Sequence, residues 1–360
     1  MNLLDRYLFR QIVSTLFKTL FSLVALYCVI DLLSERRNDI LTHHVPFGVV
    51  VDYYAAFIPT LVYQVAPLAM LVSGLMVLGA AAQNNEVTAA LAGGISLRRL
   101  VAVPVAVAVA LSICMFFLDN QVGAASYRRA EQINTNYFKQ DVDSQRAGVS
   151  WANLKGGWTC HILKFNRLAL TGEHVYLYAL RPNENEQIVA RCIYWDKKRK
   201  EWMLEDGLWM VYAPDWSLRR EQKRITLAPA PIHETPETLF ALNAAPETKS
   251  SGQLAADIRR AEQRGLSAGT HWVSYYVKFS YPALSFVMIW LAIPFALRVR
   301  RGGPAISFGM SIAIALAYMI VYGACVSLGE IGELQPFVAA WFPNAVFLTT
   351  GLVLFCRTPT

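Results

Sequence analysis

The longest stretch without a charged residue limits what this chain can fold into. Residues 53–85 lack Asp, Glu, Lys and Arg over 33 consecutive positions. About 20 apolar residues are enough for a helix to cross a bilayer, so this stretch predicts a membrane span, which we place at 57–82. Similar runs predict five further spans at about 11–31, 100–118, 279–297, 305–328 and 336–356. Lys18 interrupts the first of these, and its long side chain can reach the membrane interface.

The charged residues gather between two groups of three spans. Residues 119–278 hold 40 of the 59 charges, which is about the share found in soluble domains. The sequence therefore predicts an α-helical transmembrane protein with six spans, in halves 1–118 and 279–360, and an insert at 119–278. The net charge of +7 does not indicate a nucleic-acid partner, because the cations lie beside acids in the insert or flank the spans.

Cations in the short loops predict the orientation of the spans. Only Arg36 and Arg37 fall on one side of the membrane. Nine cations fall on the other side: Arg6, Arg10, Lys18, Arg98, Arg99, Arg298, Arg300, Arg301 and Arg357. Cytoplasmic loops are rich in Lys and Arg. We therefore expect a bacterial inner-membrane protein with both termini in the cytoplasm and the insert in the periplasm.

Most of the insert is typical of an all-β domain. Residues 175–180 and 188–195 are rich in β-branched and aromatic side chains and are bounded by turn-forming residues, so they predict strands. Alternation along the second segment places Ile188, Ala190, Cys192 and Tyr194 on one face. Further strands are expected at 201–204, 207–212 and 223–227, which together favour a sandwich or open barrel. Helical stems are expected at 127–138 and after Ser251, which we interpret as a helix cap.

Several catalytic patterns are missing from the sequence. It contains no Gly-x-x-x-x-Gly-Lys-Ser/Thr phosphate loop, no Gly-x-Ser-x-Gly elbow and no His-Glu-x-x-His helix. The adjacent pair His43 and His44 has no acid or cysteine at ligand spacing. We therefore expect a non-catalytic protein with no cofactor and no metal. Cys160 and Cys192 fall in the oxidising compartment, where either a disulfide or two buried thiols is possible.

Two sets of polar residues beside the spans are candidate sites. The loop 83–99 has a single acid, Glu86, in a short amphipathic stretch that either docks into a groove on a cytosolic partner or simply joins two spans. Outside the membrane, Arg36 and Arg37 follow the first span and Lys278 precedes the fourth. These three cations either contact lipid head-group phosphates or anchor the helices at the interface.

Four local motifs in the same order resemble the lipopolysaccharide-transport permeases, the paired F and G subunits of the Lpt exporter. The family has an acidic and small-residue pattern after its second span, matched here by Asn85-Glu86-Val87 and Ala92-Gly93-Gly94-Ile95-Ser96. The other three matches are Val65–Leu71 with its proline, Lys278–Leu284 with its Lys-x-x-x-Pro spacing, and the stem helix that begins near Gln253. The resemblance covers essentially the whole chain.

The resemblance implies a jellyroll-like periplasmic domain, a second permease subunit, a single-span periplasmic adaptor, a periplasmic bridge protein and a cytosolic ABC ATPase dimer. Lipopolysaccharide would leave the membrane through the β domain. The ATPase would grip the inner loop at Glu86, Val87, Ala90, Leu91, Gly93 and Gly94. We place the acyl-chain path on the apolar strand positions Val175, Leu177, Ile188, Ala190 and Cys192.

Two functions fit these features. A permease subunit would extract lipopolysaccharide with work supplied by the ATPase. A mechanotransmitting membrane protein would instead relay ATPase motion to a periplasmic partner, but such proteins commonly have four spans. The six spans predicted here favour the permease.

Overall fold

The structure is a computed structural model and describes residues 3–138, 148–151, 154, 156–166, 169–182, 184–216, 219–236, 239, 248–263, 269–298 and 303–357. The chain divides into two compact units. The helical unit contains residues 1–37, 50–130 and 246–360, and the sheet unit contains residues 38–49 and 131–245. Arg300 and Arg301, two of the cations used to predict orientation, lie outside the described residues.

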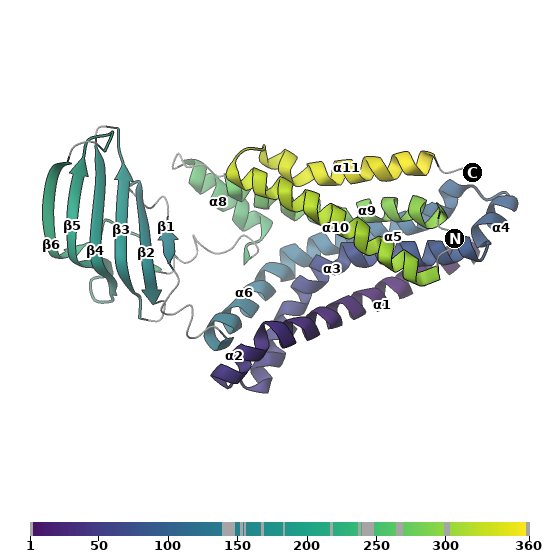
Figure 1. Ribbon diagram of the computed structural model, residues 1–360, viewed down its shortest axis with the longest axis horizontal. Helices are drawn as coiled ribbons and strands as arrows, with labels where there is room; N and C mark the ends of the chain where they lie inside the picture. The colour runs from purple at the N-terminus through teal and green to yellow at the C-terminus, as the bar shows by residue number, and fades with distance from the viewer. Residues whose placement is uncertain are drawn as a thin grey trace. The chain divides into compact units, whose positions relative to one another are not determined.

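Six helices in the described part of the chain are long and apolar enough to cross a membrane, as predicted. They are α1 (Leu3–Ser34), α3 (Phe47–Gln83), α5 (Leu97–Leu118), α9 (Gly269–Arg298), α10 (Gly303–Ile331) and α11 (Pro336–Cys356) (Figure 1). The shorter helices are α2 (Arg36–His43), α4 (Glu86–Ala92), α6 (Ala124–Ile133) and α8 (Ser251–Gln263). Two π-helical turns, η1 (Asp119–Gly123) and η2 (Asn134–Phe138), flank α6, so the helix predicted at 127–138 is confirmed.

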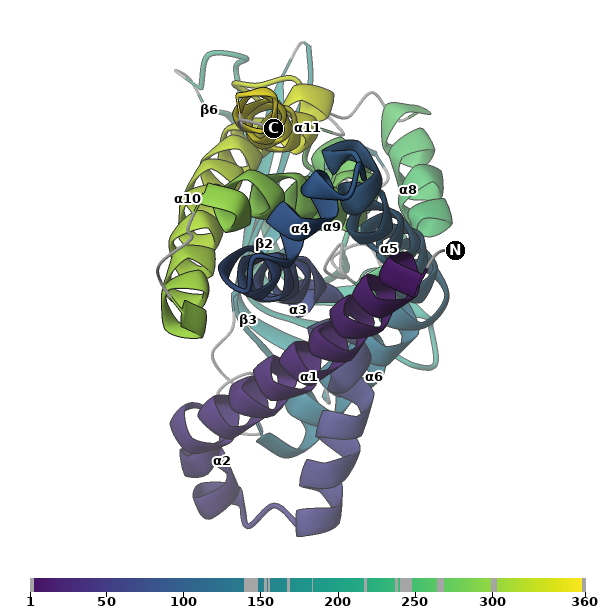
Figure 2. The ribbon, with the colours of Figure 1, turned by 90° about the vertical axis from the view of Figure 1, so that its right-hand side faces the viewer.

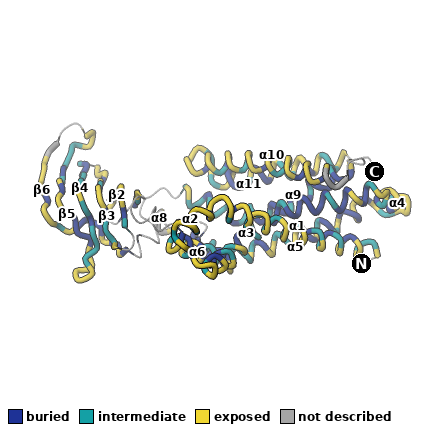
Figure 3. The backbone as a smooth tube through the Cα atoms, turned by 60° about the horizontal axis from the view of Figure 1, so that its bottom comes forward, coloured by how far each residue is buried: buried dark blue, intermediate teal, exposed yellow. Residues whose placement is uncertain are grey.

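Helices α3 and α9 form the centre of the helical unit. Most residues of their apolar windows are buried, whereas about a third or fewer are buried in the other four long helices. Helix α9 packs against α5, α10 and α11, and α11 lies on the side of the unit away from α1 (Figure 1 and Figure 2). Figure 3 shows this contrast: the residues of α9 are largely buried, and those of α10 are largely exposed. The exposed side chains include Phe17, Phe21 and Ile320, which suits a surface in contact with hydrocarbon.

Glycines let the central helices approach closely. A Cβ added at Gly74 of α3 would lie 2.6 Å from Ile289 Cδ1 and 2.8 Å from Ala292 Cβ, both on α9. A Cβ at Gly351 of α11 would lie 2.8 Å from the carbonyl oxygen of Trp290. Small residues at such contacts allow membrane helices to pack backbone against backbone. Helices α3, α9 and α11 therefore interlock through positions that admit no side chain.

The described strands of the sheet unit form one antiparallel sheet in sequence order. They are β1 (Val149–Trp151), β2 (Trp158–Asn166), β3 (Thr171–Leu180), β4 (Asn185–Asp196), β5 (Glu201–Tyr212) and β6 (Arg219–Pro229). The all-β insert is confirmed. The segments 201–204 and 207–212, expected as separate strands, are one continuous strand, β5. The described strands therefore have the connectivity of a meander.

One face of the sheet carries an apolar core that includes Trp151, Trp158 and Trp202. Chain beyond the last strand covers part of it, because Ala230, Ile232 and Leu239 belong to the same cluster. The indole nitrogen of Trp202 donates to the carbonyl oxygen of Glu234, 2.9 Å away. This bond satisfies a buried donor that would otherwise be costly. The covering segment is therefore attached by a polar contact as well as by apolar packing.

The ladder between strands is interrupted along one row that crosses the sheet. The row contains Leu163, His174, Arg191 and Asp206, which are not paired with one another in the backbone ladder although their neighbours are. His174 and Asp206 have φ values of 56° and 50°, a left-handed conformation that non-glycine residues rarely adopt. On each of these four strands, the residue in the row and one neighbour along the strand are both outside the buried class. The buried positions are consequently three apart: Ile162 and Phe165, Gly172 and Val175, Ala190 and Ile193, Leu204 and Gly207.

This interruption corrects the predicted face of β4. Strict alternation placed Cys192 with Ile188 and Ala190, but Ile193 takes the buried position and Cys192 is only half-buried. Cys192 is paired in the ladder with Glu173 and Glu205. Arg191 lies in the interrupted row, so the side chains after it change sides. Cys192 therefore falls outside the row of fully buried residues that includes Val175 and Ile188.

The two cysteines of the sheet unit are free thiols and form no disulfide. Cys160 lies fully buried on β2, next to Leu177 in the register. Burial raises the pKa of the Cys160 thiol to about 12, so the group stays protonated and unreactive at neutral pH. Cys160 on β2 and Cys192 on β4 lie on opposite sides of the interrupted row. Of the two possibilities left open by the sequence, the structure therefore shows free thiols and no disulfide.

We expect Gly74→Ala to weaken the contact between α3 and α9. The added methyl group meets Ala292 Cβ, which has no rotamer with which to move away, and overpacking of this kind costs about 1–3 kcal/mol. The measurement is the thermal unfolding midpoint of the purified protein in detergent. Gly323→Ala on α10 is the matched control, because a Cβ there meets no atom within 4 Å. Equal midpoints for the two variants would contradict the close packing at Gly74.

Candidate functional site

Helix α4 occupies the predicted inner loop and packs against the helical unit by one face. Val87 and Ala90 are buried in the core of that unit, and Leu91 packs against it. Gly93 and Gly94 are exposed, and Glu86 is half-buried. Of the six residues proposed to grip an ATPase, Val87 and Ala90 thus anchor the helix, whereas Glu86 and the two glycines face the surface.

Glu86 lies beside the first turns of α1. The hydroxyl of Tyr7 donates to Glu86 Oε1 over 3.5 Å, and the Gln11 amide donates to the Tyr7 hydroxyl over 2.7 Å. A second link joins Asp5 of α1 to Arg99 of α5, with a closest N–O distance of 3.8 Å. The loop that carries α4 is therefore held to α1 by polar contacts at both of its ends.

A polar cluster joins the far end of α1 to α2 and α3. The guanidinium of Arg36 lies 3.7 Å from Asp31, donates to the Tyr53 hydroxyl at 2.8 Å and sits 4.7 Å from the centre of the Tyr53 ring. Asp31 also accepts a 2.7 Å hydrogen bond from the hydroxyl of Tyr54. Arg36 and Asp31 are both buried, whereas Arg37 is exposed. Of the two arginines proposed for lipid contact, only Arg37 has an exposed side chain.

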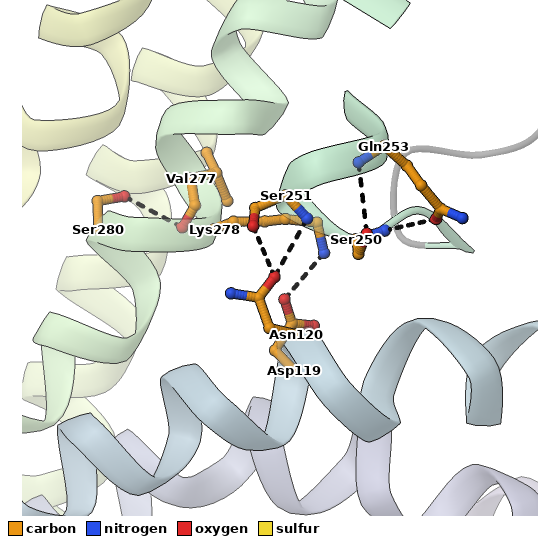
Figure 4. Close-up of polar contacts among 8 residues, drawn as sticks. All are labelled: Asp119, Asn120, Ser250, Ser251, Gln253, Val277, Lys278 and Ser280. Atoms are coloured by element: carbon orange, nitrogen blue, oxygen red, sulfur yellow. Dashed lines mark hydrogen bonds and ion pairs between the residues drawn. The ribbon is translucent and has the colours of Figure 1, made fainter. Parts of the chain in front are cut away.

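Lys278 is also engaged by a carboxylate. Its ammonium lies 2.8 Å from Asp119 Oδ2, and both side chains are nearly buried. Asp119 begins η1, the π-helical turn that follows α5. Figure 4 shows this ion pair bridging η1 and α9. A lipid phosphate would have to displace Asp119 before it could bind Lys278.

The next residue of η1 holds the start of α8. Asn120 Oδ1 accepts hydrogen bonds from the backbone nitrogen of Ser251, at 3.1 Å, and from its hydroxyl, at 2.7 Å (Figure 4). Ser250, not Ser251, caps the helix, because it exchanges hydrogen bonds with Gln253 in a capping box. We call Asp119, Asn120, Ser251 and Lys278 the η1 clamp. It joins the chain before residues 131–245 of the sheet unit to the chain after them.

The strand positions proposed for acyl chains lie in the core of the sheet unit. Val175, Leu177, Ile188 and Ala190 are buried together with the tryptophans of that cluster. Cys192 is the exception described above. Acyl chains could contact the four buried residues only if the covering side chains moved aside.

The charged pairs described above lie where an uncharged run of the sequence begins or ends. No cluster of three His, Cys, Asp or Glu side chains suited to a metal occurs among the described residues. The full sequence matches the family described as "Lipopolysaccharide export system permease LptF/LptG" over residues 6–357.

The chain belongs to the LptF/LptG family. The lipopolysaccharide export system permease protein LptG of Escherichia coli strain K12 is 24% identical over 369 residues, which cover 99% of this chain and 98% of that protein. The LptG protein of Escherichia coli O6:H1 has the same identity and coverage. The match confirms the family resemblance read from the loop after the second span and from the prolines of the second and fourth spans.

Sequence reasoning missed the partners of the predicted LptF/LptG site residues. Asp119 and Asn120 stand just after an uncharged run, and Lys278 just before one, which places all three at span ends. Their pairing is not visible in the sequence, because 159 residues separate Asp119 from Lys278. The same holds for Tyr53, which lies 17 residues after Arg36. An acid and a cation at the ends of different spans are the only signal that could have suggested such pairs.

Removing one member of the Asp119–Lys278 pair should destabilise the protein strongly. Asp119→Leu or Lys278→Met leaves an unpaired charge in a nearly buried place, which costs about 3–5 kcal/mol. The double variant removes both charges, so we expect it to recover most of that loss. The free energy of unfolding in detergent, measured for the four proteins, tests this. A double variant as unstable as the sum of the two single variants would show that the two charges do not interact.

Proposed function

We propose that this chain is a permease subunit that extracts lipopolysaccharide from the inner membrane and passes it through its periplasmic β unit to a periplasmic bridge. The observation that carries the proposal is the family match, which covers the membrane helices and the insert together. The chain thus has both parts that such a route needs, a membrane-embedded helical unit and a β unit with an apolar core.

Energetics require a partner for this function. Each CH₂ group of a lipid gains about 0.8 kcal/mol in the bilayer, so extracting several acyl chains needs an external source of work. The sequence has no phosphate loop, and a separate cytosolic ABC ATPase would supply that work. Helix α4 is the proposed docking element, with both termini in the cytoplasm. A second permease subunit, a single-span adaptor and the bridge protein would complete the assembly.

The apolar core of the sheet unit is the proposed shelter for acyl chains. Val175, Leu177, Ile188 and Ala190 would contact the lipid once the covering side chains move aside. Lipid head groups would be bound by Arg37, which is exposed. Arg36 and Lys278 would join only if phosphate displaced Asp31 and Asp119 from them.

Photo-crosslinking in the intact complex tests the lipid route. A photoreactive residue placed at Leu177 or Ile188 should capture lipopolysaccharide only when the ATPase partner hydrolyses ATP. The matched control is Tyr178, whose side chain is exposed and neighbours Leu177 on the opposite face of β3. If the inner positions give no lipid adduct while ATP is turned over, the chain is not a conduit, and a mechanotransmitting role fits better.

The docking role of Glu86 is tested by charge reversal. Glu86→Lys should abolish co-purification of the ATPase, because a reversed charge at a docked carboxylate costs about 2 kcal/mol or more, a thirtyfold loss of affinity. Glu86→Gln should give a smaller loss. Glu333→Lys, which reverses an exposed acid between α10 and α11, is the control. A complex that stays intact with Glu86→Lys would remove Glu86 from the docking surface.

A further inference from the structure

A groove of about 580 Å³ lies between α1, α3 and the start of α10. Helix α1 contributes Arg10, Gln11, Ser14 and Lys18 to its lining, and α10 contributes Ser307. The lining residues include two cations and no acid. We call this feature the basic groove. It is separate from the residues proposed above for lipopolysaccharide and for ATPase docking.

The two cations lie on one face of α1. Arg10, Ser14 and Lys18 follow one another at intervals of four residues, which places them in line along a helix, and all three are exposed. The rise of 1.5 Å per residue separates the first and last backbone positions by about 12 Å. Ser14 lies between Arg10 and Lys18 along this face, about one helical turn from each. One anionic group near Ser14 would then have a cation on each side.

These cations differ from the two buried cations near the spans. Arg36 has Asp31 and Lys278 has Asp119 as a carboxylate partner. Arg10 and Lys18 form no ion pair within the described residues, and the basic groove holds no carboxylate. A cation inside a membrane span is costly unless an opposite charge accompanies it. A ligand that brings a negative charge would therefore complement the groove.

The chemistry of the basic groove suits a phospholipid. The guanidinium, ammonium, hydroxyl and amide groups of its α1 face can all donate hydrogen bonds to phosphate oxygens. On the opposite wall, Met76, Val77 and Ala80 of α3 are apolar, as an acyl chain requires. Tyr7 also lines the basic groove and contacts Glu86 of the inner loop. The groove therefore opens toward the side assigned above to the cytoplasm.

We propose that the basic groove binds an anionic glycerophospholipid of the inner leaflet, with its phosphate between Arg10 and Lys18 and an acyl chain along α3. The lipid would be a resident ligand and not the exported substrate. The inference relies on the orientation proposed above but not on lipopolysaccharide export. A failure of one proposal therefore leaves the other standing.

Native mass spectrometry of the purified complex tests the proposal with phosphatidylglycerol as the ligand. After exchange into detergent that contains equal amounts of phosphatidylglycerol and phosphatidylcholine, the unaltered complex should retain phosphatidylglycerol preferentially. Arg10→Gln and Lys18→Gln should each weaken retention about tenfold, the effect of losing one charged hydrogen bond. Excess inorganic phosphate should not displace the lipid, because it lacks the acyl chain that contacts α3.

Arg6→Gln is the matched control, since Arg6 is an exposed cation of α1 that does not line the groove. It should retain phosphatidylglycerol as the unaltered complex does. Thermal unfolding midpoints equal to that of the unaltered complex would exclude misfolding of the variants. Equal retention by Arg10→Gln/Lys18→Gln and Arg6→Gln would overturn the proposal. So would a photoreactive residue at Ser14 that crosslinks to a partner subunit and not to lipid, because a partner's carboxylate would then be the counter-charge.

Discussion

Charge in the low-dielectric interior of a membrane must be paired, and this constraint organises the whole helical unit. It keeps the long helices free of acids and bases over most of their length, and it decides what happens to the few charges that remain. Asp31 meets Arg36 at one junction of helices, and Asp119 meets Lys278 at another. Arg10 and Lys18 face a groove without an acid. The two ion pairs thus mark internal joints between helices, and the groove marks a place suited to an external anionic group.

The sequence predicted the six spans well, because an uncharged run long enough to cross a bilayer has few other stable solutions. The β insert was also predictable from its aromatic and β-branched segments. The face of the sheet on which each side chain lies was less predictable. Alternation assumes an unbroken strand, and Cys192 follows the interrupted row at Arg191. His and Asp adopt left-handed conformations such as those of His174 and Asp206 more often than most residues do, but they are also common elsewhere, so residue type alone does not locate the change of face.

The candidate site was predictable as a set of residues but not as a set of contacts. Glu86 stands out as the single acid of the inner loop, and the family match places the chain among lipopolysaccharide export permeases. Val87 and Ala90 read as part of the same surface, yet packing against the core turns them inward. The η1 clamp depends on pairs more than 100 residues apart. Tertiary packing, which a single sequence does not display, decides which polar residues are joints and which are free.

The close packing at Gly74 and Gly351 determines which parts of the subunit can change shape. Backbones that touch have no side chains between them to rearrange, so sliding one past another would require overlap of fixed atoms. Helices α3, α9 and α11 therefore behave as one rigid body. Helices α1 and α10 are largely exposed, and hydrocarbon that surrounds them offers little resistance to tilting. We expect any change of shape within the helical unit to fall outside this rigid trio.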